Sequence, residues 1–390
     1  MNPIHNPYAP GAGTKPPALT GRDELRESLR ISLARIKLGK SAKSVLLLGL
    51  RGVGKTVLLD QILMDAEESG IHTVRIEAPE QQSLPAMLAP ALRIELLRLS
   101  RAAKAKDVAW RALKALAGFA KALKVTYQDI EVGLDAEPEK GLADNGDLAT
   151  DLSALLQAAG EAAKQEATAL VLFIDELQYV QEAELAALIT ALHRCAQKQL
   201  PVTLVGAGLP QLRGKMGEAK SYAERLFEFP EMGPLSRQSC DQALVIPARI
   251  EGVEFEETAL ERIFNETKGY PYFIQEWGKH SWDVASRSPI TFEDVVIASK
   301  ETIAALDESF FRVRFDRLTP LEKDYMKAMS LLGKGPHRSG DIAARMNKEV
   351  TRLAPIRSGL IAKGMIYSPS HGETAFTVPL FDEFILRVMP

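Results

Sequence analysis

The feature that most constrains this chain is the segment Val45–Thr56, which reads Val-Leu-Leu-Leu-Gly-Leu-Arg-Gly-Val-Gly-Lys-Thr. Its first four residues form a short apolar run, as expected of a strand that is buried on both faces. Four residues separate Gly49 from Gly54-Lys55-Thr56, which is the phosphate-loop spacing G-x-x-x-x-G-K-S/T. A helical pattern follows, so the segment predicts a strand, a phosphate-binding turn and a helix.

The residue types explain why a phosphate would bind there. Gly49, Gly52 and Gly54 have no Cβ atom, so successive backbone N–H groups can surround a phosphate. Lys55 is expected to reach the β- and γ-phosphates, and the Thr56 hydroxyl to hold Mg²⁺. The N-terminus of the following helix adds its dipole. The predicted nucleotide-binding residues of this segment are Gly49, Leu50, Arg51, Gly52, Val53, Gly54, Lys55, Thr56 and Val57.

A second motif lies at Ala169–Glu176, where an apolar strand ends in Asp-Glu. Asp175 would lie at the carboxyl end of the strand and hold Mg²⁺, and Glu176 would orient or deprotonate the attacking water. Further strands are predicted at Thr73–Glu77 and Pro201–Gly208, with helices between them. This alternation predicts an α/β fold with a parallel sheet and a ligand at its carboxyl edge. The two motifs together predict ATP and Mg²⁺ as ligands, and ATP hydrolysis to ADP and phosphate as the reaction.

An arginine that acts on a neighbouring subunit is a further candidate. Arg225 follows the strand at Pro201–Gly208, and a cation there could stabilise charge on the transferring phosphate. Arg213 is a weaker rival for this role. The alternative is that Arg225 is an ordinary solvated arginine on a helix.

Composition excludes several other classes of protein. The 390 residues suffice for two or three domains, and 46% hydrophobic and 25% charged residues are ordinary for a globular chain. The net charge of −3 requires any nucleic-acid contact to come from a local basic surface. Cys195 and Cys240 are far apart in sequence and fit reduced thiols without a metal motif. Without a membrane-length apolar run or a signal pattern, we expect a cytoplasmic protein with no membrane span.

A basic amphipathic segment interrupts the strand–helix pattern. Between Arg93 and Lys124 there are nine basic residues and two acidic ones. Its apolar residues share one helical face: Trp110, Leu113, Leu116, Phe119, Ala120 and Leu123. Such a helix can bind a membrane surface, nucleic acid or a protein partner. The alternative is that the apolar face packs on the core and leaves a solvated basic face. A short hairpin is predicted directly after it, at 125–132.

The pattern divides the chain into four parts. Residues 1–19 are rich in Pro, Gly and Asn and predict an extended arm without a regular element. Residues 20–233 are predicted to form the phosphate-loop core, with a basic helical insertion at about 93–147. Residues 234–316 read as a helical lid. The arm and the helix from Thr20 to Lys37 either cover the nucleotide base or simply pack on the core.

Residues 317–390 have the pattern of a winged helix-turn-helix. Thr319-Pro320 opens a helix, two more helices follow, and two short strands flank Pro369–Gly372 as a wing. From Leu318 to Pro390 there are ten basic and seven acidic residues. We expect double-stranded DNA to be contacted by Lys348, Arg352, Arg357 and Lys363. The alternative is a protein-interaction module, a use that the same fold also has.

This order of parts resembles the AAA+ ATPases of the origin-recognition and initiator type, and the related archaeal-ATPase and signalling-NTPase branch. Gly49–Thr56 and Asp175-Glu176 match that family's Walker A and Walker B motifs. Gly21-Arg22-Asp23-Glu24 resembles its adenine-side motif, and Gly269-Tyr270-Pro271 resembles the Gly-x-Pro that opens its lid helix. The resemblance adds Arg22 and Pro271 to the predicted nucleotide-binding residues.

The sequence departs from the family at two positions. Leu204–Leu209 contains Gly-Ala-Gly where the family usually has a polar sensor residue, and Thr203 is the nearest polar side chain. The family's second sensor arginine also has no clear counterpart. Both departures predict slow turnover.

We therefore expect an ATP-dependent molecular switch that couples its nucleotide state to DNA binding or to self-assembly through the C-terminal winged helix. The alternative is a signalling or defence NTPase that binds a protein partner through the winged helix or the basic insertion. A third possibility is a scaffold that binds nucleotide without turnover.

Overall fold

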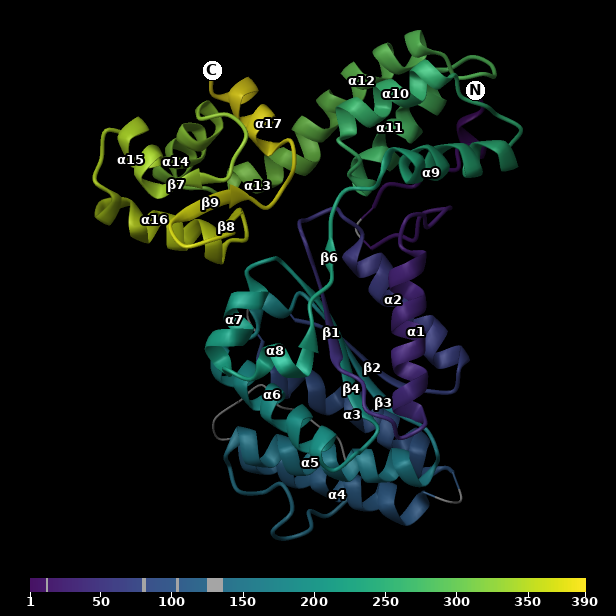
Figure 1. Ribbon diagram of the computed structural model, residues 1–390, viewed down its shortest axis with the longest axis vertical. Helices are drawn as coiled ribbons and strands as arrows, with labels where there is room; N and C mark the ends of the chain where they lie inside the picture. The colour runs from purple at the N-terminus through teal and green to yellow at the C-terminus, as the bar shows by residue number, and fades with distance from the viewer. Residues whose placement is uncertain (12, 79–81, 103–104, 125–135) are drawn as a thin grey trace.

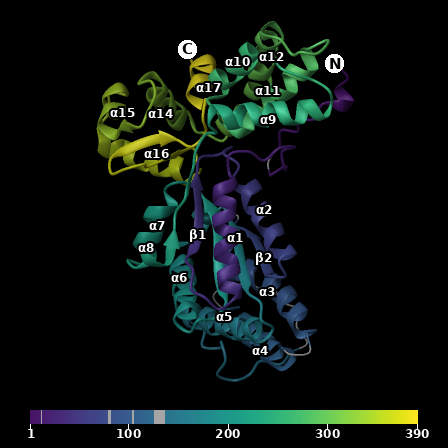
Figure 2. The ribbon, with the colours of Figure 1, turned by 45° about the vertical axis from the view of Figure 1, so that its right-hand side comes forward.

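The computed structural model describes residues 1–11, 13–78, 82–102, 105–124 and 136–390. Figure 1 shows a sheet covered by helices in the lower part of the molecule, a helical lid above it, and a C-terminal domain beside the lid. Figures 1 and 2 both place the C-terminal domain over the end of the core that carries α7 (Leu212–Ala219) and α8 (Ala223–Leu226). The phosphate-loop segment lies where these three parts meet.

The central sheet is parallel throughout. Its strands run in the order β2-β3-β4-β1, and β5 and β6 both pair with β1. The strands are β1 (Ser44–Gly49), β2 (His72–Glu77), β3 (Leu170–Asp175), β4 (Val202–Gly208), β5 (Phe227–Glu228) and β6 (Glu231–Met232). Every residue of β1, β3 and β4 is buried, which is why these strands read as apolar runs in the sequence. The predicted parallel α/β sheet is confirmed.

The register of the strands brings the two sequence motifs to one edge. Leu48 of β1 pairs with Gly208 of β4, and Asp175 of β3 pairs with Glu77 of β2. The chain that leaves β1 and the carboxylates that end β3 therefore lie at the same carboxyl edge of the sheet.

Alternate residues of the strands pack against two layers of helices. Val45 and Leu47 face one core cluster with residues of α1 (Asp23–Lys37) and α2 (Lys55–Glu68). Leu46 and Leu48 face the other cluster, formed with α3 (Leu84–Ser100), α4 (Lys106–Leu123), α5 (Leu148–Gln165) and α6 (Glu182–Gln197). A 3-10 turn, η2 (Leu177–Tyr179), follows β3.

The basic segment spans the end of α3 and all of α4, and the apolar face of α4 lies inside the protein. Leu113, Leu116 and Phe119 are fully buried in the cluster that contains residues of α3 and α5. Trp110, at the edge of this face, is 40% exposed. The structure therefore follows the alternative in which the apolar face packs on the core, and that face is not free to enter a membrane. The predicted hairpin at 125–132 lies outside the described residues.

The lid contains α9 (Arg237–Ile250), α10 (Glu257–Thr267), α11 (Pro271–Val284) and α12 (Phe292–Leu306). Ser236 and Thr291 cap α9 and α12 by accepting backbone N–H bonds, as their positions in the sequence predict. The N-terminal arm runs along this lid, and the Tyr8 hydroxyl donates to the Leu244 carbonyl over 2.6 Å. The prediction of no regular element in the arm is wrong at η1 (Pro3–His5), a 3-10 turn that the Asn2 side chain caps.

A π-helical turn, η3 (Asp307–Phe311), and α13 (Arg312–Asp316) connect the lid to the C-terminal domain. Phe311 stacks on Phe384 of the last helix at 5.3 Å between ring centroids. Buried residues of the lid and of the C-terminal domain belong to one hydrophobic cluster. The two regions therefore share a core across the predicted boundary at 316–317.

The C-terminal domain consists of short helices around a small antiparallel sheet with the strand order β7-β9-β8. Its elements are α14 (Pro320–Leu331), β7 (His337–Arg338), α15 (Ser339–Arg345), α16 (Val350–Ala362), β8 (Ile366–Tyr367), β9 (Glu373–Phe376) and α17 (Phe381–Val388). Pro355 lies in the second turn of α16, which begins at Val350. No helix in the described residues is long and apolar enough to cross a bilayer.

The burial of α4 predicts a large stability effect for Phe119→Ala. Removing a fully buried phenylalanine ring should lower the free energy of unfolding by about 3–5 kcal/mol. Trp110→Ala is the control on the same helix and should cost no more than about 1 kcal/mol, because that ring is partly exposed. Denaturant-induced unfolding measures both. Equal effects of the two substitutions would contradict the described packing of α4.

Candidate functional site

The phosphate loop joins β1 to α2, and its glycines have conformations that side chains would oppose. Gly52 and Gly54 have φ angles of 81° and 85°, in the left-handed region. A Cβ atom on Gly49 would lie 2.5 Å from the Met232 carbonyl oxygen. The loop therefore requires glycine at these positions, and it presents its backbone N–H groups at the N-terminus of α2.

Lys55 is the first residue of α2, and its ammonium group lies at the centre of the loop. Its side chain is buried, and Nζ donates a 2.9 Å hydrogen bond to the Leu50 carbonyl. Burial lowers the pKa of Lys55 to about 8, although the Glu176 and Asp175 carboxylates act in the opposite direction. A phosphate in the loop would add a counter-charge in direct contact with this cation.

Thr56 and Asp175, the two residues predicted to hold Mg²⁺, are in contact. The Thr56 hydroxyl donates to Asp175 Oδ2 over 2.6 Å. Hydroxyl and carboxylate oxygens are suitable Mg²⁺ ligands, and Mg²⁺ usually takes its remaining ligands from water and phosphate. No cluster of three or more His, Cys, Asp or Glu side chains suited to a metal occurs among the described residues. The donor set therefore fits a magnesium ion bound together with a nucleotide and does not resemble an all-protein cage.

Glu176 is connected to the end of β4 by Gln178, a residue that the sequence reasoning missed. Gln178 Nε2 donates to the Glu176 carboxylate, and its Oε1 accepts the Leu209 backbone N–H over 3.1 Å. A Cβ on Gly208 would lie 2.8 Å from this Oε1. Gly208, at the position where the family has its polar sensor residue, thus leaves space for the side chain of Gln178, which follows β3.

Thr203 cannot serve as the polar sensor residue in this arrangement. Its hydroxyl lies 3.1 Å from the Ser44 hydroxyl. Ser44 begins β1 and Thr203 is the second residue of β4, so both lie at the amino edge of the sheet, away from the phosphate loop.

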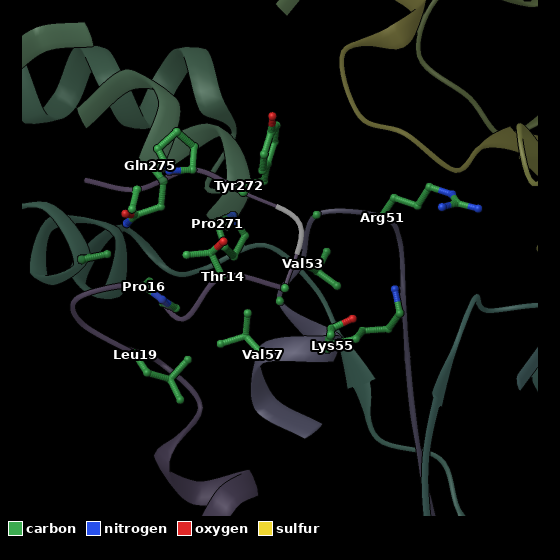
Figure 3. A pocket seen from close by; sticks show the side chains of 18 of the residues that line it. Thr14, Pro16, Leu19, Arg51, Val53, Lys55, Val57, Pro271, Tyr272 and Gln275 are labelled. Atoms are coloured by element: carbon green, nitrogen blue, oxygen red, sulfur yellow. The ribbon is translucent and has the colours of Figure 1, made fainter. Parts of the chain in front are cut away.

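A cavity of about 320 Å³ lies over the phosphate loop, between the N-terminal arm and the lid. Figure 3 shows Thr14, Pro16 and Leu19 of the arm on the side of the loop where Val57 lies, while Arg51 points to the other side. The predicted nucleotide-binding residues that line this cavity are Arg22, Arg51, Gly52, Val53, Gly54, Lys55, Thr56, Val57 and Pro271. Gly49 and Leu50 are not among its lining residues. The arm thus covers the apolar end of the cavity, where a base would lie.

Arg51 connects the phosphate loop to the C-terminal domain. Its backbone N–H donates to the Thr377 carbonyl over 3.1 Å, and its Nη2 donates to the Tyr179 hydroxyl over 2.7 Å. A Cβ on Gly364 would lie 2.8 Å from the same Nη2, so the guanidinium lies directly against the turn that follows α16. The sequence contains no local signal for these contacts, since Arg51 and Thr377 belong to different parts of the chain.

The lid contacts the loop through Tyr272. The Tyr272 backbone N–H donates to the Gly52 carbonyl over 3.1 Å. The Tyr272 ring stacks on Phe310 at 4.7 Å, and the Arg314 guanidinium lies 4.0 Å from the centroid of the Phe310 ring. Phe310 and Arg314 both line the cavity, and sequence reasoning missed both.

The two arginines considered for a trans-acting role lie outside the cavity. Arg225 is exposed on α8 and lines a small pocket with Ser44 and Thr203, at the amino edge of the sheet. Arg213 is exposed on α7, forms an ion pair with Glu231 at 3.2 Å, and lies near the Phe229 ring. Neither reaches the cavity of its own chain, and a role on a neighbouring subunit stays a prediction.

The four residues predicted to contact DNA fall into two groups. Lys348 and Arg352 are exposed. Arg357 instead donates to Thr374 Oγ1, Ser368 Oγ and the Glu373 carbonyl inside the domain. Lys363 forms an ion pair with Glu322 at 2.6 Å. Within the described part of the chain, two of the four cations are therefore free of such contacts.

Comparison with known proteins matches residues 18–205 to the AAA ATPase domain and residues 308–385 to a domain of unknown function. No curated protein matches the sequence. Similar solved structures include the Walker-type ATPase PAby2304 of Pyrococcus abyssi, which is 16% identical with a TM-score of 0.58 over 94% of this chain and 96% of that one.

Two further solved structures are similar at lower scores. The Aeropyrum pernix ORC1 protein in complex with DNA is 16% identical, with a TM-score of 0.48 over 96% of this chain and 94% of that one. The Thermotoga maritima RuvB Holliday junction branch migration motor is 18% identical, with a TM-score of 0.45 over 95% of this chain and 98% of that one. The Pyrococcus match supports the fold described above.

The position of Lys55 predicts that Lys55→Ala removes most of the affinity for nucleotide. Loss of a charge-assisted contact to phosphate should weaken ADP and ATP binding by at least about 100-fold, or about 2.7 kcal/mol. Titration calorimetry with Mg²⁺ and each nucleotide measures the loss. Lys43→Ala is the control, because Lys43 is an exposed lysine just before the amino end of β1. Retained affinity in Lys55→Ala would contradict the site.

Proposed function

This chain belongs to the AAA+ P-loop ATPases, as its motifs indicated, and we propose that it is a slowly hydrolysing ATP switch whose nucleotide state controls its C-terminal domain. The observation that carries the proposal is the contact between Arg51 of the phosphate loop and the C-terminal domain. Arg51 is both a lining residue of the cavity and a hydrogen-bond donor to Thr377.

The residues of the site would have different roles in ATP hydrolysis. The loop N–H groups and Lys55 hold the phosphates, and Thr56 with Asp175 would hold Mg²⁺, which neutralises charge on the phosphates when it is bound. Glu176 lines the cavity, and its negative charge is close enough to Lys55 to raise the pKa of that lysine. The Glu176 carboxylate can therefore orient a water at the terminal phosphate. The arm encloses the base.

Nucleotide binding can be coupled to the C-terminal domain because the phosphate loop is hydrogen-bonded to that domain. Phosphate in the loop would attract the Lys55 ammonium away from the Leu50 carbonyl, since a phosphate oxygen is the stronger acceptor. Leu50 precedes Arg51, so such a change occurs one residue from the N–H group that donates to Thr377. A ligand that favours one arrangement of this contact shifts the population of C-terminal domain positions.

Slow turnover is supported by the contacts of Glu176. Its carboxylate already accepts a hydrogen bond from Gln178, which is in turn bonded to the Leu209 N–H. A carboxylate that is hydrogen-bonded in this way is less free to reorient towards water.

Double-stranded DNA is the partner that we propose for the C-terminal domain. The order of helices and strands from α14 to β9 supports this proposal, because it is compatible with a winged helix-turn-helix, in which one helix enters the major groove. Lys348, just before α16, and Arg352, in its first turn, are exposed and available to phosphates.

One observation favours a second candidate, in which the C-terminal domain binds a protein in a signalling or defence role. Arg357 and Lys363 are engaged in contacts inside the domain, so the exposed side of α16 is poorer in cations than its sequence indicated. A less basic surface suits a protein partner better than DNA. A stoichiometric protein partner that is captured from the cell and unaffected by nuclease would favour this candidate.

We propose that the protein is cytoplasmic and that it can assemble with further copies of itself. Cys195 and Cys240 are both buried and unpaired, as in proteins of reducing compartments. Burial raises the pKa of each thiol to about 12, so neither is a reactive thiolate. Self-assembly would give Arg225 or Arg213 access to a neighbouring nucleotide.

Glu176→Gln should separate nucleotide binding from hydrolysis. Removing the only charge of this side chain at constant size should lower phosphate release by about 100-fold or more. The affinity for ATP should change little, because the phosphate contacts come from the loop and Lys55. Single-turnover phosphate release with Mg²⁺ and ATP measures the rate. Equal rates at the background level for wild type and variant would mean that the site binds nucleotide without turning it over.

DNA binding should depend on nucleotide, on salt, and on Lys348 and Arg352. Replacing both residues by Ala should weaken binding of duplex DNA in the ATP state and reduce the slope of log K against log salt by about 2. The control carries Arg287→Ala and Lys300→Ala, two exposed lid cations, and loses the same net charge. Sizing the protein with and without ATP, in the presence of duplex DNA, reports assembly in the same experiment. Absence of DNA binding in the ATP state at low salt would contradict a DNA-binding switch.

A further inference from the structure

Arg314 is a cation of the nucleotide cavity that comes from outside both the phosphate loop and the lid helices. It belongs to α13, the short helix between the lid and the C-terminal domain, and it lines the cavity together with Lys55, Arg51 and Glu176. Nothing in the local sequence marks it as a nucleotide-binding residue. The structure alone brings it to the site.

The guanidinium of Arg314 has no acidic partner among the described residues. Its Nη1 donates to the Phe310 carbonyl over 2.5 Å, and its plane lies over the Phe310 ring. Within the described part of the chain, no carboxylate forms an ion pair with it. Burial, followed by the positive charge of Arg51, lowers the pKa of Arg314 to about 10. The group is still protonated at neutral pH, so it is a half-buried cation in need of an anion.

A stack of side chains fixes where this cation lies relative to the phosphate loop. Tyr272 is bonded to Gly52 of the loop, Phe310 stacks on Tyr272, and Arg314 lies on Phe310. The titratable groups nearest to Arg314 are Arg51, Tyr272, Arg317 and Tyr179. Tyr179 is three residues beyond Glu176 and is bonded to Arg51. Arg314 therefore lies at the charged end of the cavity.

The two ends of the cavity have different chemistry. The arm residues Pro16 and Leu19, with Leu235 and Ala243 of the lid region, supply an apolar end suited to a base. Lys55 and Glu176 mark the opposite end, where the last phosphate and the attacking water would lie. An additional cation at that end would contact the terminal phosphate, a group that ATP has and ADP lacks.

We propose that Arg314 binds the terminal phosphate of a nucleoside triphosphate and thereby distinguishes ATP from ADP in this protein. The proposal rests on the nucleotide site of the proposed function and adds the residue that recognises the triphosphate. A guanidinium is well suited to this, because it can donate two parallel hydrogen bonds to phosphate oxygens.

The location of Arg314 also connects that recognition to the C-terminal domain. Phe311, on the preceding turn, packs on Phe381 and Phe384, and Phe315, the next residue after Arg314, packs edge-on to Phe384 at 5.7 Å. A phosphate that attracts Arg314 therefore acts on a turn that is anchored in the core of the C-terminal domain.

Arg314→Ala tests the proposal through a ratio of affinities. We would measure the dissociation constants of ADP and of the β,γ-imido analogue of ATP, both with Mg²⁺, by titration calorimetry. The variant should bind the analogue at least about 10-fold more weakly, and ADP less than about 3-fold more weakly, than wild type. Preserved ADP binding shows that the variant is folded. Arg314→Gln, which keeps a planar group over Phe310, should show the same change in ratio.

Arg312→Ala is the matched control. Arg312 lies on the same short helix, is exposed and is near the Phe384 ring, so its removal should leave both affinities unchanged. An unchanged analogue-to-ADP ratio in Arg314→Ala and Arg314→Gln overturns the inference and leaves the proposed function intact. Failure of wild type to bind either nucleotide overturns both.

Discussion

The structure depends on two backbone hydrogen bonds that hold the phosphate loop from different sides. The Arg51 N–H donates to Thr377 of the C-terminal domain, and the Gly52 carbonyl accepts from Tyr272 of the lid. Consecutive residues of one loop are thereby bonded to two other parts of the molecule. Because a glycine-rich loop has few side chains to stabilise it, such bonds decide its conformation. Any ligand that changes the conformation of the loop must therefore alter its hydrogen bonds to both the lid and the C-terminal domain.

The charges around the loop explain why an anion belongs there. Lys55, Arg51 and Arg314 converge on one cavity, and the pKa values of Lys55 and Arg314 are lowered by burial and by the neighbouring positive charge of Arg51. Bringing like charges together in a partly buried site costs free energy that bound phosphate would offset. Asp175 and Glu176 act in the opposite direction on Lys55, but two carboxylates do not balance three cations. The apo site is therefore biased towards a polyanion, as a triphosphate is.

Local patterns were sufficient for the sheet and for the centre of the site. The strand, the glycine turn and the helix start at Lys55-Thr56 form as predicted, because the conformation of each depends mainly on residues that are close in sequence. Asp175 follows from the end of a buried apolar strand. The basic segment left two interpretations open, because an amphipathic pattern shows which face is apolar and does not show what covers it. Gln178 and Arg314 could not be predicted, since their roles come from contacts with Leu209 and Phe310 that only the folded chain creates.

The contact at Thr377 is suited to transmit a displacement because its surroundings are rigid. Thr377 is fully buried, its backbone N–H donates to the Met365 carbonyl, and its hydroxyl donates to the Gly364 carbonyl. Gly364 in turn lies against the Arg51 guanidinium. The loop is therefore bonded to a buried, hydrogen-bonded residue between α16 and α17. At such a position the backbone cannot shift locally without breaking hydrogen bonds. A change at the loop must then either move the C-terminal domain as a unit or break its contact with Arg51.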